Sequence, residues 1–595
     1  MSSWGADAPA EPADDAFGAS DAFGAPDPNE AGEDGADAAA AENLSLKFAT
    51  LTLSKEEFRN KAVAKGWTET TAYDYGAFQE GFQTGSHGAS QKYEWNDEYG
   101  DVAPKIPDLE RILFGGEFQV SKGKHMENLP VEVALDSEEK VAPISTFDDA
   151  GLHPVILENI KLAQYSLPTP IQRYTIPAVL QGKDVVAIAQ TGSGKTAAYM
   201  IPTLSKLMGK AKKLRGPRPG ASSPKVRAEP LVVIVVPTRE LAMQIFDEAR
   251  RMCYRSMLRP CVTYGGRPYA DTMDDLAQGC EILIATPGRL TDLMDKPHVL
   301  TMSRVKYTII DEADEMLNTD WSEALAEIMG GGDTNDDADH VYMMFSATFP
   351  KGARQMAREY MSQSYVRIRI GRAGQAHKNI RQNILYVDKD QKRECVYDLL
   401  FSMEDPGRTI IFCNFKSEVD LVDDFLYNRG IPSTSIHSDR NQCEREDAMR
   451  AFRQGKAPVL VATGVSARGW DVKDVKHIIN YDLPSCMYGG ITEYIHRIGR
   501  TARIGHQGLA TSLYNERNED IAQDLVNTLV ECDCEIPEFL QHLVPENTQE
   551  IDFGDDSEDE IEGEDGFGGG DAGGAAAVAD DSGFAADGAV PPADW

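Results

Sequence analysis

A short run of Val, Ile and Ala leads into residues 189–196, which read Ala189-Gln190-Thr191-Gly192-Ser193-Gly194-Lys195-Thr196. Gly192 and Gly194 allow backbone amides to approach phosphate oxygens, while Lys195 supplies a cation and Thr196 supplies a hydroxyl for Mg²⁺. The usual pattern begins with glycine, where this chain has Ala189. A plain glycine turn before a helix is the alternative, but it leaves the lysine and the threonine unexplained. The stretch predicts a phosphate-binding loop between a strand and a helix.

Short apolar runs rich in Val and Ile recur along the chain and alternate with longer amphipathic stretches. Each run ends at polar residues or glycine, which is typical of buried parallel strands. The first series comprises residues 184–189, 231–236, 282–285, 307–310 and 341–345. The second series comprises residues 408–413, 458–462 and 477–480. Two such series predict an α/β chain with two parallel sheets, each of which binds ligands at the carboxyl ends of its strands.

The segment Asp311-Glu312-Ala313-Asp314 directly follows the predicted strand 307–310. A carboxylate at a strand end can hold Mg²⁺, and the adjacent Glu312 can polarise an attacking water. On their own, such residues more often form a solvated acidic turn. Together with the phosphate-binding loop, they predict the two halves of one phosphoryl-transfer site.

Charge is distributed unevenly along the 595 residues, whose formal net charge is −37. Residues 1–140 contain 28 acidic and 11 basic residues, and residues 546–595 contain 16 acidic and no basic residues. The middle of the chain is therefore nearly neutral. A uniformly acidic protein would not be expected to bind nucleic acid, but a neutral middle can still gather basic side chains in one groove. Nucleic acid stays among the expected ligands.

Composition also predicts the domain organisation. The two ends are rich in Ala, Gly, Pro and acidic residues and bury too little apolar surface to offset chain entropy, so we expect disordered tails. The predicted segments are tails at 1–42 and 546–595, an extension with short docking elements at 43–143, a first domain at 144–370, a linker at 371–382 and a second domain at 383–545.

The nine cysteines are scattered, and the one close pair, Cys532 and Cys534, lacks a second pair that would complete a zinc site. Free thiols of a reducing compartment are the better interpretation. The N-terminus shows no basic segment followed by an apolar run, and no apolar stretch is long enough to span a membrane. We expect a soluble cytoplasmic protein without a membrane partner, with the nucleus as a second location.

Further motifs complete a pattern that resembles the DEAD-box RNA helicases over residues 144–540. Several of the motifs are weak alone, but their joint order along the chain is highly specific. Besides the phosphate-binding loop and the acidic tetrad, the motifs are Pro168-Thr169-Pro170-Ile171-Gln172, Pro237-Thr238-Arg239-Glu240-Leu241, Gly265-Gly266, Thr286-Pro287-Gly288-Arg289, Ser346-Ala347-Thr348 and His496-Arg497-Ile498-Gly499-Arg500-Thr501-Ala502-Arg503. The resemblance implies two tandem RecA-like domains that close on ATP and single-stranded RNA. It also implies RNA-stimulated hydrolysis of ATP with Mg²⁺ as the metal cofactor.

The resemblance implies roles for the residues of the nucleotide site. Gln172 would read the adenine edge and Tyr165 would pack against the ring, with Phe147 at the family's spacing before Tyr165. A proline-capped helix start would explain the Pro and Thr ahead of Gln172, but not Gln172 itself. Asp471 would lie near the ribose. The residues implied in phosphate binding are Ala189, Gln190, Thr191, Gly192, Ser193, Gly194, Lys195 and Thr196.

The resemblance also implies residues for catalysis and for coupling between the domains. Arg500 and Arg503 would stabilise the γ-phosphate only when the two domains meet, which ties hydrolysis to closure. His496 would bridge toward the acidic tetrad. The residues implied in catalysis are Lys195, Asp311, Glu312, His496, Arg500 and Arg503. Those implied in Mg²⁺ binding are Thr196 and Asp311, and those implied in coupling are Asp314, Ser346, Ala347 and Thr348.

RNA contacts are implied at loops along the sheet edges. In the first domain they are Pro237, Thr238, Arg239, Gly265, Gly266, Thr286, Gly288 and Arg289, and in the second domain Gln442, Arg445 and Thr463. Backbone amides, hydroxyls and guanidinium groups suit phosphate and sugar rather than bases, so little sequence preference is expected. Discrimination for RNA would rest on the 2′-hydroxyl. For Gly265 and Gly266, a simple turn is as good an interpretation as close phosphate approach.

The segments 109–114 and 129–133 resemble the extension of the Vasa and Ded subgroup, whose members act on mRNA, commonly in translation initiation or ribonucleoprotein remodelling. Three features depart from the family. Gly464 stands where Asp is usual and Trp470 where Leu is usual, and the segment 485–493 is longer than the family spacing. Gly464 would either alter RNA binding or relax the turn, and the longer segment is best interpreted as a surface insertion.

The third departure is that the tails are acidic rather than basic, so they are not expected to anchor RNA. Four aromatic residues are candidate anchors, namely Trp4, Phe17, Phe23 and Trp595. They would dock protein partners or fold back over the basic RNA-binding loops of the protein itself. A merely solubilising tail is the alternative. The sequence predicts an ATP-dependent RNA helicase that unwinds short duplexes or remodels ribonucleoproteins. The alternative is an ATP-dependent RNA clamp or scaffold with little unwinding.

Overall fold

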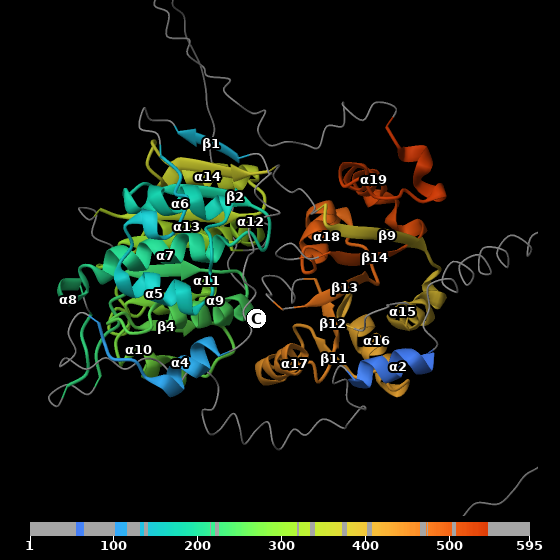
Figure 1. Cartoon of the computed structure of the whole chain (residues 1–595), viewed down its shortest axis with the longest axis horizontal. Coiled ribbons are helices and arrows are strands. Elements are labelled where there is room, and N and C mark those ends of the chain that lie inside the picture. Colours follow the sequence, from blue (N-terminus) through green and yellow to red (C-terminus); the bar gives the residue numbers. More distant parts are fainter. Residues whose placement is uncertain are drawn as a thin grey trace, which may run out of the picture. The chain divides into compact units, whose positions relative to one another are not determined.

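The computed structural model describes most of the region that carries the motifs (Figure 1). The described residues are 55–64, 102–115, 131–135, 141–214, 216–220, 225–317, 321–333, 339–371, 378–401, 407–464, 472, 474–502 and 507–545. The predicted tails lie outside these residues, and so do Trp470, Asp471 and Arg503. Among the described helices, none has the length and apolar character needed to cross a membrane.

The first domain is built on an eight-stranded sheet with the order β1-β8-β2-β7-β6-β3-β5-β4. All neighbouring strands are parallel except β1 and β8, which pair antiparallel. In the order of the sheet, the strands are Val131–Leu135, Val366–Ile370, Val185–Ala189, Val341–Ser346, Tyr307–Asp311, Val232–Val235, Ile282–Ala285 and Pro260–Thr263.

Helices cover both faces of this sheet because its strands are apolar on both sides. Val185 and Ala187 of β2 belong to one hydrophobic core, whereas Val186 and Ile188 belong to another. The helices of the first core are α4 (Pro107–Phe114), α5 (Pro154–Leu162), α6 (Pro170–Leu180), α7 (Lys195–Met208) and α9 (Arg239–Met252). Those of the second are α10 (Tyr269–Leu276), α11 (Pro287–Met294), α12 (Ala313–Leu317), α13 (Ser322–Met329) and α14 (Lys351–Tyr360). The short helices η1 (Asp148–Ala150) and α8 (Ala211–Leu214) complete the domain.

The second domain is built on a six-stranded parallel sheet with the order β11-β12-β10-β13-β14-β9. In that order the strands are Ser433–Ile436, Val459–Thr463, Arg408–Cys413, Val475–Asn480, Gly508–Tyr514 and Ile380–Tyr386. One core includes residues of α17 (Gln442–Gln454), α18 (Gly490–Ile498) and α19 (Ala522–Glu531). The other includes residues of α15 (Lys392–Phe401), α16 (Lys416–Asn428) and the early helix α2 (Lys55–Ala64). Short helices occur at Lys389–Gln391, Cys486–Tyr488, Glu516–Ile521 and Glu538–Leu543.

The two parallel-sheet α/β domains confirm the predicted fold class, and each of the eight predicted strands is present. Six strands went unpredicted, namely β1, β4, β8, β9, β11 and β14. The linker predicted at 371–382 is shortened, because β9 already begins at Ile380. The strand alternates buried Ile380 and Gln382 with an exposed Arg381, so it lacks the continuous apolar run that marked the others.

The extension ahead of the first domain docks against it through α4. Leu109, Leu113 and Phe114 are buried in the first core, and the Phe114 ring meets the Tyr254 ring edge-on at 5.7 Å. The hydroxyl of Tyr254 accepts a hydrogen bond from the backbone amide of Ile106 at 3.0 Å. Helix α4 therefore packs on the first domain at the end of α9.

Candidate functional site

The phosphate-binding loop connects β2 to α7 and places Lys195 at the start of the helix. Its Nζ lies 3.1 Å from the carbonyl oxygen of Ala189 and 3.4 Å from Oε2 of Glu312, and the side chain is buried. Gly194 caps the helix with a φ of 90°, and a Cβ there would lie 2.5 Å from Nε2 of Gln172. Conformation and space both require glycine at this position. The lysine ammonium therefore lies between the carbonyl oxygen of Ala189 and the carboxylate of Glu312.

The acidic tetrad begins at the carboxyl end of β6, where Asp311 is buried. Its Oδ2 accepts a hydrogen bond from the Tyr199 hydroxyl of α7 at 2.9 Å. Burial, and then the neighbouring charge of Glu312, raise the pKa of Asp311 to about 7. A divalent cation would offset both effects, and carboxylate and hydroxyl oxygens are the donors that Mg²⁺ prefers. Asp311 and Thr196, which follows Lys195 on α7, are therefore chemically suited to hold Mg²⁺.

Glu312 has a φ of 55°, which is uncommon for a residue with a side chain. In a regular strand, successive side chains point to opposite faces. The left-handed residue breaks this alternation, so that Asp311 contacts Tyr199 of α7 while Glu312 contacts Lys195 at the start of the same helix. Local backbone strain of this kind is found at functional sites. Here it turns two consecutive carboxylates toward the phosphate-binding loop.

The last residue of the tetrad joins the third motif. Oδ2 of Asp314 accepts hydrogen bonds from the backbone amide and the hydroxyl of Thr348, at 3.1 Å and 2.8 Å. The backbone amide of Asp314 donates to Oγ of Ser346 at 3.3 Å. Ala347 lies between Ser346 and Thr348 in the sequence, and its side chain is buried. The structure therefore brings together all four residues predicted for coupling.

The second domain reaches this group through His496 on α18. Nδ1 of His496 lies 2.7 Å from Oε1 of Glu315, and Nε2 lies 3.7 Å from Oδ2 of Asp314. Burial opposes a charged imidazole, but the hydrogen bond and charge of Glu315, with Asp314 and Glu312, outweigh it and raise the pKa of His496 to about 9. The expected bridge is present, but its shortest contact is to Glu315, which the sequence analysis did not assign.

Glu315, Glu493 and His496 also place three potential metal-ligating atoms within 4.8 Å of one another. Each of these side chains already has a charged or hydrogen-bonding partner. His496 pairs with Glu315, and Glu493 pairs with the guanidinium of Arg497 at 2.9 Å. The cluster is therefore an ion-pair network between the two domains.

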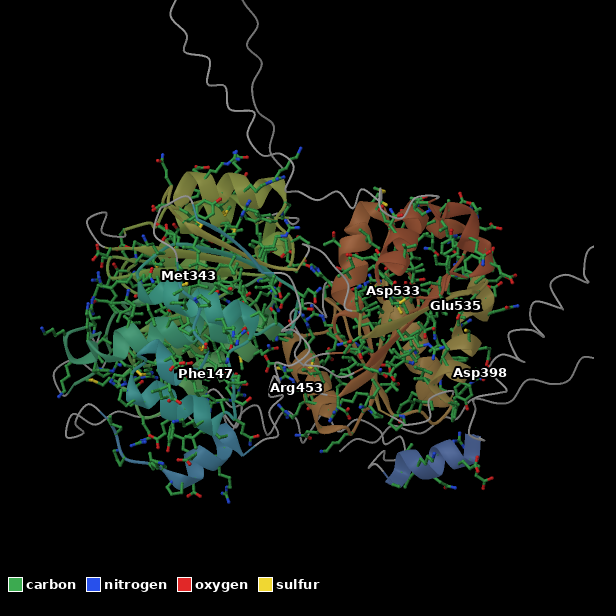
Figure 2. The ribbon with its side chains drawn as sticks, turned by 45° about the horizontal axis from the view of Figure 1, so that its top comes forward. Phe147, Met343, Asp398, Arg453, Asp533 and Glu535 are labelled. Carbon is green, nitrogen blue, oxygen red and sulfur yellow. The ribbon has the colours of Figure 1, made fainter. Side chains whose placement is uncertain are left out.

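The residues predicted for adenine binding lie near the start of α6. The Gln172 side chain bonds to the backbone amide of Thr169 at 3.0 Å and to the carbonyl of Gly194 at 3.1 Å. Gln172 therefore completes a capping box, so the helix start does explain this residue, contrary to our expectation. The Tyr165 hydroxyl donates to Oε1 of Glu248 at 2.7 Å, and Phe147 is buried in the first core (Figure 2).

The residues predicted to bind RNA in the first domain lie at three strand ends. Pro237 and Thr238 follow β3, and Thr238 caps α9 by accepting from the amide of Leu241 at 3.3 Å. Gly265 and Gly266 follow β4, whereas Thr286, Gly288 and Arg289 follow β5. Gly266 has a φ of 85°, and a Cβ there would collide with the guanidinium of Arg239. The two glycines therefore allow a turn with a positive φ at Gly266 and leave space for the guanidinium of Arg239.

Two of the residues predicted to bind RNA in the second domain, Gln442 and Arg445, contact the first domain. Nη1 of Arg239 donates to Oε1 of Gln442 at 2.9 Å, and Arg445 forms a buried ion pair with Glu240 at 2.8 Å. Thr463 ends β12, next to the carboxyl end of β10. A third contact joins the hydroxyl of Tyr264 to Oε1 of Glu446 at 3.2 Å. Glu240, Tyr264 and Glu446 were missed, although Glu240 lies within a quoted motif and the other two each adjoin a predicted residue.

The predicted catalytic arginines are only partly described. Arg500 is buried, and its Nε donates to the carbonyl oxygen of His496 at 3.0 Å. The preceding Gly499 accepts a hydrogen bond from Oγ1 of Thr191 in the phosphate-binding loop at 3.4 Å. This contact brings the arginine-bearing turn to the phosphate loop. Arg503 and Asp471 lie outside the described residues, so their placement stays a prediction.

Both domains match known families in sequence. A sequence model of the DEAD/DEAH box helicase family matches residues 169–356, and a model of the helicase conserved C-terminal domain matches residues 391–505. A DEAD box protein from the hyperthermophile Methanococcus jannaschii is 31% identical, with 66% of this chain and 99% of that chain covered and a TM-score of 0.38.

Two structures of Dbp5 from S. cerevisiae are also similar. One, a variant bound to a Gle1 variant and IP6, is 26% identical, with 65% of this chain and 92% of that chain covered and a TM-score of 0.52. The other, bound to RNA and ADP BeF3, is 24% identical, with 68% of this chain and 100% of that chain covered and a TM-score of 0.56.

Proposed function

Because the chain belongs to the DEAD-box RNA helicase family, an RNA-dependent ATPase family, we propose that its two domains bind ATP and RNA jointly and use hydrolysis to separate short duplexes or remodel ribonucleoproteins. The observation that carries this proposal is the meeting of both domains at two ligand regions. His496 and Gly499 reach the acidic tetrad and the phosphate-binding loop. Arg239 and Glu240 reach Gln442 and Arg445.

The nucleotide region supports phosphoryl transfer by positioning and charge. We propose that the phosphate-binding loop holds the β- and γ-phosphates through backbone amides and Lys195, which exchanges its present contact with Glu312 for phosphate oxygens. Glu312 then orients the attacking water and accepts its proton. Bound at Thr196 and Asp311, Mg²⁺ would supply charge neutralisation of the phosphates. Arg500 adds positive charge to the transferring phosphate only while the domains are in contact.

The same contacts link hydrolysis to RNA. The second domain carries both the RNA-facing residues of α17 and the groups of α18 that reach the nucleotide region, so a strand that bridges the two domains draws both together. Arg239 and Arg445, now paired with Gln442 and Glu240, are suited to phosphate oxygens of that strand. Closure bends the bound strand, and loss of phosphate after hydrolysis reopens the domains.

An ATPase assay with and without single-stranded RNA, run beside a short-duplex unwinding assay, tests the proposal. We expect turnover to rise strongly with RNA, and unwinding to require ATP. Equal turnover in the presence and absence of RNA would contradict the joint-binding mechanism. Strong RNA-stimulated turnover without unwinding would instead favour the ATP-dependent clamp.

We further propose that the protein belongs to the Vasa and Ded subgroup and acts on mRNA in the cytoplasm, in translation initiation or mRNA remodelling. The support is the extension, whose helix α4 carries the residues 109–114 that resemble this subgroup and docks on α9. Crosslinking in cells followed by RNA sequencing tests this proposal. Recovery of mRNA near translation start sites is the expected result, and recovery of only ribosomal or spliceosomal RNA would contradict it.

A further inference from the structure

Gly464 directly follows β12 and is buried, but it is not among the glycines with positive φ. Its backbone conformation is therefore open to other residues. Space is the constraint, because a Cβ on Gly464 would collide with Oε1 of Glu493 and lie 2.8 Å from Nη2 of Arg497. The absence of a positive φ argues against a relaxed turn, which was one of the two explanations that the sequence suggested. Gly464 makes room for the side chains of α18.

The side chains that fill this room form a buried ion pair. Nε of Arg497 donates to Oε1 of Glu493 at 2.9 Å, and the exposed side-chain fractions are 5% and 3%. The two residues lie one helical turn apart on α18. Buried charges of this kind are retained only when they are paired and hydrogen-bonded, and removal of one partner is strongly destabilising. Glu493 therefore fixes where the Arg497 guanidinium lies.

The remaining donors of Arg497 hold the ends of two strands. Nη1 donates to the carbonyl oxygen of Asp482 at 2.8 Å, and Nη2 donates to Oδ1 of Asn414 at 3.0 Å. Asp482 follows β13 and Asn414 follows β10, so both lie at the carboxyl edge of the second sheet. The guanidinium also lies over the Phe412 ring, 5.4 Å from its centre. Arg497 thus fastens α18 to the sheet edge at which the domains meet.

The same helix carries the groups that reach the first domain. His496 precedes Arg497 and contacts Glu315, while Gly499 lies at the end of the helix and contacts Thr191. A shift or rotation of α18 would displace both contacts together, because they lie on one rigid element.

We propose that Glu493 is a positioning residue for ATP hydrolysis, which holds Arg497 so that α18 presents His496 and Arg500 to the first domain, and that Gly464 exists to admit its carboxylate. The inference deepens the proposed RNA-stimulated ATPase and rests on it. Glu493 touches neither substrate nor reacting atoms. Its effect is expected on the catalytic step, through the register of α18.

The test removes the carboxylate of Glu493 and introduces a new one at position 464, which also faces Arg497. Four full-length chains are compared: the natural protein, Gly464→Asp, Glu493→Ala, and the double variant. Each single variant is expected to lower the RNA-stimulated kcat by about tenfold or more, a size typical of coupled neighbouring residues. The double variant is expected to recover most of the loss, because the introduced aspartate occupies the space vacated by Glu493 and faces Arg497. The apparent KM for ATP should change little, as expected for an interaction needed mainly at the catalytic step.

Glu493→Gln and Glu394→Ala complete the set. Glu493→Gln keeps the shape and an acceptor without the charge, and is expected to fall between the natural protein and Glu493→Ala. It keeps the test valid if Gly464→Asp does not fold. Glu394 forms an exposed ion pair with Arg429 in the same domain, so Glu394→Ala should leave turnover unchanged.

Two outcomes would overturn the inference: a double variant no more active than the weaker single variant, or a Glu493→Ala variant with the natural kcat. Melting temperatures measured in parallel separate unfolding from misplacement of α18. If the natural protein shows no RNA stimulation, the proposed function fails. If RNA stimulates turnover but the double variant does not recover activity, only the positioning role of Glu493 fails.

Discussion

Lys195 is the residue whose loss should be felt most directly. Its buried ammonium already lies between a loop carbonyl and the Glu312 carboxylate, which is the charge distribution that a phosphate group would replace. We expect Lys195→Ala to lower RNA-stimulated ATP turnover by at least about a hundredfold, comparable to the loss of one preorganised donor in other active sites. Lys206→Ala is the matched control, since Lys206 lies in the last turn of the same helix, where its Nζ donates to the carbonyl oxygen of Val179. Full turnover in Lys195→Ala would contradict the assignment.

Glu312→Gln should separate binding from hydrolysis. The substitution preserves shape but removes the carboxylate that would accept the proton of the attacking water. We expect hydrolysis to slow by about 10²–10⁴-fold, the usual range for a general base. ATP and RNA should still bind, so that a complex with both ligands persists. The lifetime of fluorescent RNA on the protein with ATP measures this, and rapid release at the natural rate would count against the role.

At the scale of single residues, the sequence predicted side-chain chemistry better than side-chain partners. The catalytic loops were predicted because Lys195 and Asp311 each follow a strand that could be identified. Gln172 was not understood as a helix cap, because capping depends on local geometry as well as residue type. Glu315 was missed because its partner, His496, lies far along the chain. Glu493 pairs with a residue one helical turn away, but its surroundings include Gly464 and, through Arg497, Asn414, which are distant in the sequence. Tertiary contact of this kind leaves no local pattern.

At the scale of elements, the continuous apolar strands could be predicted and the less apolar ones could not. Strands β3, β5 and β6 lie inside the first sheet and are buried throughout, which gives them unbroken Val and Ile runs. Strands β4 and β11 lie at sheet edges, and β11 contains Ser433, Thr434 and Ser435. Strand β8 alternates Ile with arginine because one of its faces is only partly buried. A criterion of continuous hydrophobicity therefore favours central strands.

The docked helix α4 allows a prediction about the extension. Leu113 is buried against the first domain, whereas the adjacent Ile112 is 51% exposed. We expect Leu113→Ala to weaken docking of α4 by about 2–4 kcal/mol, as for other buried leucines. Hydrogen exchange of the α4 amides measures the loss directly. Ile112→Ala makes a similar truncation on the exposed side and should leave exchange nearly unchanged, so equal effects from both variants would show that α4 is not docked through this face.

For the whole molecule, His496 predicts a pH dependence of the contact between the domains. Its pKa in the folded protein is about 9, above the ordinary value of about 6.5. The raised pKa means that the contact with Glu315 is fully stabilising below pH of about 6.5 and is lost as the pH rises through about 9. We expect RNA affinity with a non-hydrolysable ATP analogue to weaken across this window.

The variant His496→Gln isolates this contribution, because glutamine can still donate a hydrogen bond to Glu315 but does not titrate. RNA affinity of the variant should be lower at neutral pH and should change less between about pH 6.5 and pH 9. Asp311 is present in both proteins under the same conditions, so its contribution cancels in the comparison. Identical pH profiles would show that His496 is not charged in the assembled protein.

The antiparallel strand β1 has a practical consequence for anyone who shortens the chain. It pairs with β8 along five residues, from Val131 with Ile370 to Leu135 with Val366, and thereby covers the outer border of the first sheet. A fragment that starts at residue 141 retains every helicase motif of residues 144–540 but leaves the amides and carbonyls of β8 facing water. Unpaired edge strands of this kind can pair with strands of other protein molecules. We expect such a fragment to self-associate in light scattering, whereas one that starts at residue 102 should not.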